Sequence, residues 1–146
     1  MTGLPPFSPS PSESMDFSSP RFRIEKTRQF ERSIKKISKF YKSSSEKAKF
    51  GLFVTDILKS LLGQPHPSDS SPEPLPAKSQ LPEGWTLHKL RQKRGPGASG
   101  QIRLIYLINE PERVIKPLWI YTHEQYSKRP PDSELLEVLR EALEDG

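Results

Sequence analysis

Residues 85–122 read WTLHKLRQKRGPGASGQIRLIYLINEPERVIKPLWIYT, and this stretch decides the fold. Its β-branched and aromatic residues gather in three runs separated by turn-forming residues, which predicts three successive strands. The runs are Trp85–Arg91, Ile102–Ile108 and Val114–Thr122. The glycines and proline of RGPGASG at 94–100 are typical of a hairpin loop, and 109–113 supplies the next turn. Pro117 has no N–H to donate to a ladder, so we expect a bulge or an unpaired position there.

Upstream of these strands, a short strand at 21–25 precedes two segments with apolar residues at helical spacing. The first segment begins after a Thr27 cap, and the second runs from about residue 46 to 62. Downstream, Asp132 or Ser133 caps an acidic helix with regularly spaced leucines. This order predicts an α+β fold, with an N-terminal strand and helical hairpin packed on a small, mostly antiparallel sheet and a short C-terminal helix. The sheet's other face then meets water, a ligand or the acidic helix.

Proline and serine mark two segments that we expect to lack regular structure. Residues 1–20 hold five prolines and six serines, and residues 63–82 hold six prolines and four serines. Such a composition buries too little apolar surface to offset chain entropy. The sequence therefore predicts a disordered tail at 1–20, followed by one domain over 21–143 that contains a flexible insertion at 63–82.

Cysteine is absent, which excludes disulfides and thiolate zinc sites. No apolar run approaches the roughly 20 residues of a membrane span, and residues 1–20 lack the pattern of a secretory signal. A cytoplasmic protein without a membrane partner is the expectation.

Charge is unevenly distributed along the chain. Residues 21–129 carry a net charge of +12, whereas residues 130–146 carry −5 and residues 1–20 carry −2. A strongly basic central region attracts phosphate backbones or an acidic partner. A merely solvated basic surface remains the alternative.

Cations and proton-transfer groups converge at one end of the predicted strands. Lys89 and Arg91 lie near the end of the first strand and Arg103 near the start of its neighbour, while His123 and Tyr126 follow the third. Such a set suits RNA cleavage by the substrate's own 2′-hydroxyl, which needs a base, an acid and fixed positive charge. The alternatives are solvated strand-end charges and a structural, hydrogen-bonded histidine. His66, His88 and His123 are scattered in the sequence, so we expect neither metal nor cofactor.

Three segments together resemble the strands of RelE/ParE superfamily toxins: WTLHKLR at 85–91, GQIRLIY at 100–106 and IYTHEQY at 120–126. The resemblance implies the toxin of a toxin–antitoxin pair, with messenger RNA on the ribosome as target and a cognate antitoxin as partner. It likens Lys89 and Arg91 to the family's basic strand positions, Arg103 to its phosphate-contacting arginine, and His123 or Tyr126 to its C-terminal catalytic residue. Leu87 stands where some members have a further lysine, which shifts weight to His123.

Two other functions fit the same resemblance. A ParE-like inhibitor of DNA gyrase shares the fold without nuclease activity, and an inactive relative acts as a binding module. We expect the RelE-like mRNA interferase branch, a metal-independent endoribonuclease, because the set of Lys89, Arg103 and His123 is catalytic in character.

Overall fold

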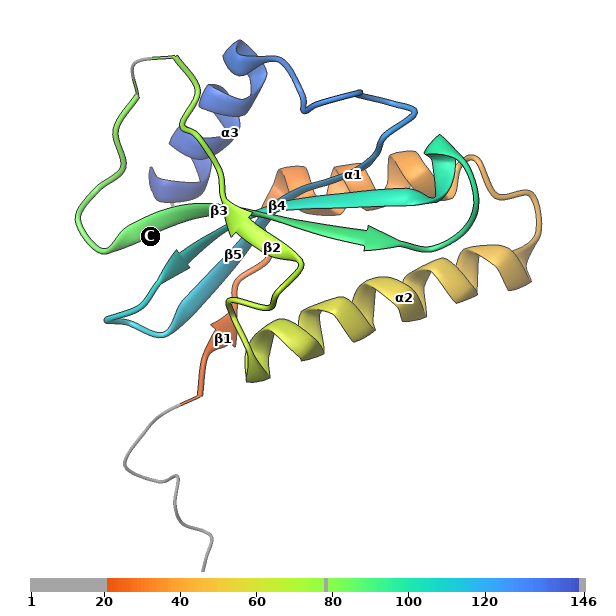
Figure 1. The fold of residues 1–146 in the computed structure, drawn as a ribbon, viewed down its shortest axis with the longest axis horizontal. Helices are drawn as coiled ribbons and strands as arrows, with labels where there is room; N and C mark the ends of the chain where they lie inside the picture. The colour runs from red at the N-terminus through yellow and green to blue at the C-terminus, as the bar shows by residue number, and fades with distance from the viewer. Residues whose placement is uncertain (1–20, 78, 145–146) are drawn as a thin grey trace, which may run out of the picture.

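The computed structural model describes residues 21–77 and 79–144, so the expected tail at 1–20 lies outside the described residues. The fold is α+β, as predicted: an N-terminal strand, two helices, a five-stranded and mostly antiparallel sheet, and a C-terminal helix (Figure 1). Its elements are β1 Arg23–Ile24, α1 Arg28–Ser38, α2 Ser44–Gly63, β2 Ser70–Pro72, β3 Trp85–Lys93, β4 Gln101–Asn109, β5 Val114–Thr122 and α3 Asp132–Glu144.

The strand order in the sheet is β1-β5-β4-β3-β2, and β1 pairs with β5 in parallel while the other pairs are antiparallel. The bulge expected at Pro117 is confirmed, because Tyr106 pairs with Pro117 but Ile105 pairs with Trp119. The extra residue bends β5 locally and releases a carbonyl from the ladder. The Thr27 hydroxyl donates a 2.9 Å hydrogen bond to the Pro117 oxygen and so ties the start of α1 to the bulge.

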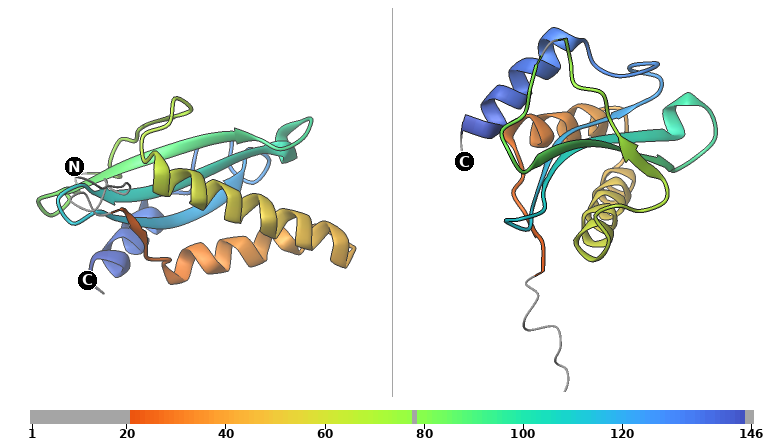
Figure 2. Two further views of the ribbon diagram at one scale, coloured as in Figure 1. Left: turned by 90° about the horizontal axis from the view of Figure 1, so that it is seen from below. Right: turned by 60° about the vertical axis from the view of Figure 1, so that its left-hand side comes forward.

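Both helices of the hairpin begin at side-chain caps. The Thr27 side chain accepts a hydrogen bond from Phe30 N, and Ser43 and Glu46 form a reciprocal capping box at the start of α2. The two helices lie side by side on one face of the sheet (Figure 2), where their apolar residues and those of β3, β4 and β5 form one buried cluster.

The C-terminal helix covers part of the opposite face, which confirms the hypothesis that the acidic helix lies on its own sheet. Leu135, Leu139 and Ala142 pack against inward-facing residues such as Leu87 and Ile105 in a second cluster. Four acidic residues of α3 are exposed and Glu141 is half-buried; the exposed ones are Asp132, Glu134, Glu137 and Glu144. No helix in the described ranges is both long and apolar enough to cross a membrane.

The segment 63–82 contains a strand that the sequence does not predict, so the expectation of no regular structure was wrong there. β2 pairs antiparallel with β3, placing Ser70 opposite Leu90 and Pro72 opposite His88. A proline is tolerated at the outer edge of a sheet, because an edge strand needs no N–H on its free side. The insertion therefore runs along the β3 edge.

Candidate functional site

Strand alternation gathers the predicted cations on the face that α3 partly covers. Arg91, Arg103 and Tyr121 lie directly opposite one another across β3, β4 and β5. Lys89 is two residues from Arg91 on the same side of β3, in the row that contains Ile105. Since Ile105 and Tyr121 belong to the α3-side cluster, the cations face the same way.

The Arg91–Arg103 pair is the most unusual feature of this face. Like charges directly opposite in a sheet repel each other. Arg91 donates to the Ser71 hydroxyl at 3.1 Å, and Arg103 donates to the Ile102 carbonyl and the Gln101 side chain, each at 3.2 Å. Within residues 21–77 and 79–144, neither guanidinium forms an ion pair with a carboxylate. An anion placed between them would relieve the repulsion.

Lys89 is buried, unlike Arg91, which is exposed. Its Nζ lies 3.3 Å from Glu73 Oε2 and donates to the Lys128 carbonyl at 3.2 Å. Burial lowers the pKa of Lys89, and the nearby charges of Arg91 and Arg129 add to this, while Glu73 opposes it. The ammonium therefore has protein partners in this arrangement, and its access to a ligand requires Glu73 to move.

The two tyrosines near the end of β5 form an aromatic group with Trp119. Tyr126 meets Tyr121 and Trp119 edge to face, with ring centroids 5.7 and 6.2 Å apart. Tyr121 is buried and donates to the Lys128 carbonyl at 2.7 Å. Burial raises the pKa of both phenols. Both hydroxyls thus stay protonated at neutral pH, so they can donate hydrogen bonds but are poor bases.

His123 lies one residue beyond β5, where its backbone N–H donates to the Gln101 carbonyl at 2.9 Å. This bond extends the β4–β5 ladder and brings His123 to the same end of the sheet as Arg103. The residue is half-buried, and no described side chain forms a hydrogen bond or ion pair with its ring. The structure therefore brings Lys89, Arg91 and Arg103 together on one face, and it places His123 and Tyr126 at the end of that face.

One charged residue of the site, Glu73, was missed from the sequence, whereas Arg129 is one of the cations that follow the third predicted strand. Glu73, which is 6% exposed at its side chain, bridges Lys89 and Arg129, with Arg129 Nη1 3.0 Å from the carboxylate. A carboxylate in a run of prolines and serines gives no periodic signal, so nothing in the sequence places Glu73 beside β3. Arg129, which follows the third predicted strand, is half-buried and pairs with Glu73 and Asp132.

The scattered positions of His66, His88 and His123 in the sequence suggested that the three side chains lie apart, but two of them are close together. The rings of His66 and His88 meet edge to face at 5.1 Å between centroids, near the Glu110 turn. Across the described ranges, however, no three histidine or acidic side chains are arranged to hold a metal ion. The metal-independent mechanism stays an expectation.

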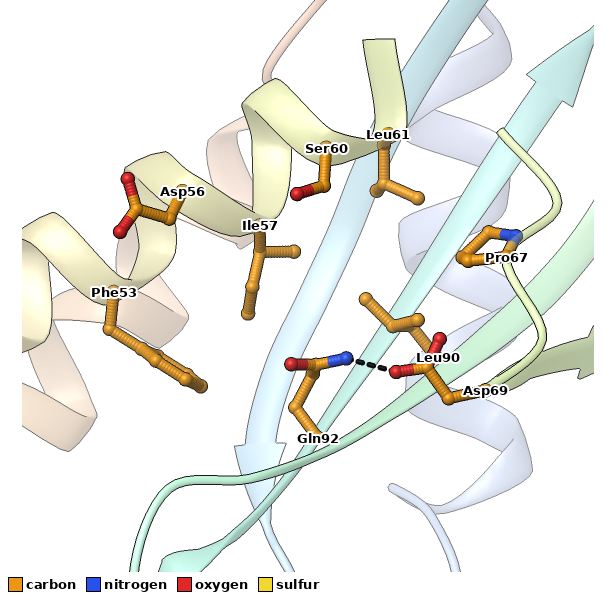
Figure 3. A pocket seen from close by; sticks show the side chains of 9 residues that line it. All are labelled: Phe53, Asp56, Ile57, Ser60, Leu61, Pro67, Asp69, Leu90 and Gln92. Atoms are coloured by element: carbon orange, nitrogen blue, oxygen red, sulfur yellow. Dashed lines mark hydrogen bonds between the residues drawn. The ribbon is translucent and has the colours of Figure 1, made fainter. Parts of the chain in front are cut away.

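A cavity of about 340 Å³ lies on the other face, between α2, β3 and residues 67–69 (Figure 3). Gln92 reaches from β3 to a hydrogen bond with Asp69, and Asp56 and Phe53 border the cavity from α2. Its charged lining is acidic, so it would repel phosphate.

No family model matches this chain, and no curated protein matches it either. Among solved structures, it is similar to a chain of the archaeal RelE–RelB complex from Pyrococcus horikoshii OT3. The two are 17% identical with a TM-score of 0.45, and the match covers 69% of this chain and 93% of the other. A likeness this distant assigns no function.

Proposed function

We propose that this protein is a metal-independent endoribonuclease that cuts messenger RNA, and that it acts as the toxin of a toxin–antitoxin pair. The observation that carries the proposal is the Arg91–Arg103 pair. Arg91 of β3 lies directly opposite Arg103 of β4, and neither has a carboxylate partner in the described chain. Arginine binds two phosphate oxygens at once, and a phosphodiester between the two guanidinium groups would satisfy both.

The proposed reaction is transfer of the phosphoryl group to the neighbouring 2′-oxygen of the RNA. His123 accepts the proton of the 2′-hydroxyl, and the 2′-oxygen attacks phosphorus. The bond from phosphorus to the 5′-oxygen breaks, and that oxygen takes up a proton from water. The products are a 2′,3′-cyclic phosphate and a 5′-hydroxyl, and Arg91 and Arg103 stabilise the charge of the transition state. Tyr126 orients the nucleotide.

The surroundings of Tyr126 support an extended RNA path. Tyr126 lines a cavity of about 300 Å³ together with Trp119 and with Arg32 and Lys36 of α1. Aromatic rings offer stacking surfaces to unpaired bases, and the cations suit the adjoining phosphates. The exposed basic side of α1 would also meet ribosomal RNA, and a cognate antitoxin would neutralise the basic face with acidic segments.

The first test is cleavage of messenger RNA, mapped by primer extension after brief induction of wild type and Arg103→Ala. We expect the variant to cut about 10²–10³-fold less, as when one group that stabilises a transition-state charge is removed. Arg140→Ala is the matched control, because Arg140 is an exposed arginine of α3 paired with Glu137. Equal cleavage by Arg103→Ala and wild type would exclude Arg103 from the site.

The second test concerns the proton-transfer step. Purified His123→Ala should lose about 10²–10⁴-fold in rate on RNA, while RNA with a 2′-O-methyl group at the scissile position should resist both proteins. Cleavage of the 2′-O-methyl substrate would rule out the mechanism. Growth arrest without RNA cleavage, together with inhibited supercoiling by purified gyrase, would favour the ParE-like alternative.

A further inference from the structure

Residues 69–77, called the strap here, lie along the β3 edge and are fastened by the cations of the proposed site. Arg91 N donates to the Asp69 carbonyl and Glu73 N to the Leu87 carbonyl, each at 2.9 Å, on either side of the three-residue β2 pairing. The Arg91 guanidinium also donates to the Ser71 hydroxyl at 3.1 Å. One of the two facing arginines thus already holds the strap.

The centre of the strap is the Glu73 carboxylate. It lies 3.3 Å from Lys89 Nζ and 3.0 Å from Arg129 Nη1, and its side chain is 6% exposed. Arg129 in turn donates to the Pro74 carbonyl and pairs with Asp132 at 2.9 Å. Asp132 also accepts a 3.2 Å hydrogen bond from Ala77 N, so that the charged network closes the strap against the start of α3.

Glu73 contacts Lys89, which lies on the same side of β3 as Arg91 and two residues from it. The charges of Glu73, Arg103, Arg91 and Arg129 all act on the pKa of the Tyr121 phenol, which lies opposite Arg103. A carboxylate and a phosphodiester present similar oxygens to lysine and arginine donors. Glu73 thus makes contacts of the kind that an RNA phosphate would make on this face.

An open surface hollow borders the strap, although Pro76 of the strap is itself buried. A cavity of about 510 Å³ lies between it and the Trp85 end of β3, and another of about 380 Å³ separates residues 79–82 from α3. Leu75 and Leu81 are partly buried at the margin of the second core cluster. Removing the strap would therefore uncover some apolar surface but leave the packing between the sheet and α3 in place.

We propose that Glu73 occupies the seat of an RNA phosphate and that the strap leaves this seat when RNA binds. The inference deepens the proposed function and rests on it, since it takes this face to be the RNA site. Displacement would free Lys89 and Arg129 to join Arg91 and Arg103 around the phosphodiester. The buried lysine would in this way become a phosphate ligand.

The first experiment measures binding of a fluorescent, fully 2′-O-methylated RNA oligonucleotide, so that cleavage plays no part. We expect Glu73→Gln to bind about tenfold more tightly than wild type, because the competing negative charge is gone while the shape is kept. Glu137→Gln, at an exposed carboxylate of α3, is the control and should match wild type. Unchanged or weaker binding by a folded Glu73→Gln would overturn the proposal.

A second variant covers the case in which Glu73→Gln does not fold. The chain has no cysteine, so Ala77→Cys with Asp132→Cys introduces a single disulfide position between the strap and α3, where Ala77 N lies 3.2 Å from the Asp132 carboxylate. The oxidised protein, with its disulfide verified by mass spectrometry, should bind at least tenfold more weakly than the same protein after reduction. Equal binding by the two forms would overturn the proposal. If RNA binding changes in these variants as expected but the wild-type protein cuts no RNA, the proposed nuclease activity is refuted and the displacement of the strap is not.

Discussion

One buried side chain, His88, makes the free energy of unfolding depend on pH. His88 is 6% exposed, stacks on Tyr106 and shares a 2.7 Å hydrogen bond with the Thr86 hydroxyl. Burial lowers its pKa from 6.5 to about 4, and the nearby His66 adds to the effect, while Glu110 opposes it. The unfolded chain therefore takes up a proton between these two pH values before the folded chain does.

Because the unfolded state binds more protons there, the free energy of unfolding should fall as the pH drops below 6.5, and it should be level with respect to His88 above that value. The full loss by pH 4 is on the order of 3 kcal/mol. His88→Phe should show a shallower decline than wild type in urea denaturation at pH 7, 6 and 5. Ser60→Ala, at an exposed serine of α2, serves as the comparison. Parallel curves for wild type and His88→Phe would contradict the assignment.

Among the helices and strands, α1 has a second role as a cover for the outer edge of β5. β1 pairs with β5 at two positions, opposite Val114 and Ile115. Within residues 21–77 and 79–144, the following residues of β5 have no partner strand on that side. Ser33 of α1 accepts a 3.0 Å hydrogen bond from Ile120 N and donates to the Phe30 carbonyl at 2.7 Å. The buried Ser33 hydroxyl thus accepts a hydrogen bond that a neighbouring strand would otherwise accept.

Ser33→Ala should lower the free energy of unfolding by about 1–3 kcal/mol, because it leaves the buried Ile120 N–H without a partner. Urea denaturation at pH 7 measures the change. Ser60→Ala, at an exposed serine of α2, should stay within about 0.5 kcal/mol of wild type. A loss of equal size in both variants would contradict the assignment, because alanine favours a helix more than serine does and the loss at Ser33 is attributed to the hydrogen bond with β5.

The sequence predicted these elements where the local signal was strong. Thr27 predicted the start of α1 and Pro117 predicted the bulge in β5. Both signals are local, because a helix cap and a missing backbone N–H affect the structure only within a few residues. β2 was missed because its three residues, SSP, pair through backbone atoms with a strand 18 residues away, and their side chains show no alternation. Glu73 was missed for the same reason: its importance depends on Lys89 and Arg129, which only the folded chain brings near.

As a whole molecule, the protein separates its charge into a basic body and an acidic C-terminal helix. Long-range attraction of RNA to such a body should weaken as salt rises, with a log–log slope of about −0.7 per phosphate contacted. The double variant Arg32→Ala with Lys36→Ala should make this slope shallower by about 1.4 if both cations meet phosphates beside Tyr126. Anisotropy titrations between 50 and 200 mM salt measure it, and Lys59→Ala on α2 is the control. Identical slopes for the double variant and wild type would show that Arg32 and Lys36 of α1 do not contact RNA phosphates.

The pairing of β2 with β3 has a consequence for how the molecule behaves in a crowded solution. The sheet ends in two short strands, β1 beside β5 and β2 beside β3, and α1 also covers part of β5, so neither β5 nor β3 presents a long row of free N–H and C=O groups. If the strap leaves to admit RNA, the nine residues of β3 become an open edge of the kind that recruits another extended chain. Activity would then be coupled to a risk of self-association, and RNA lying across that edge would protect the protein from aggregation while it works.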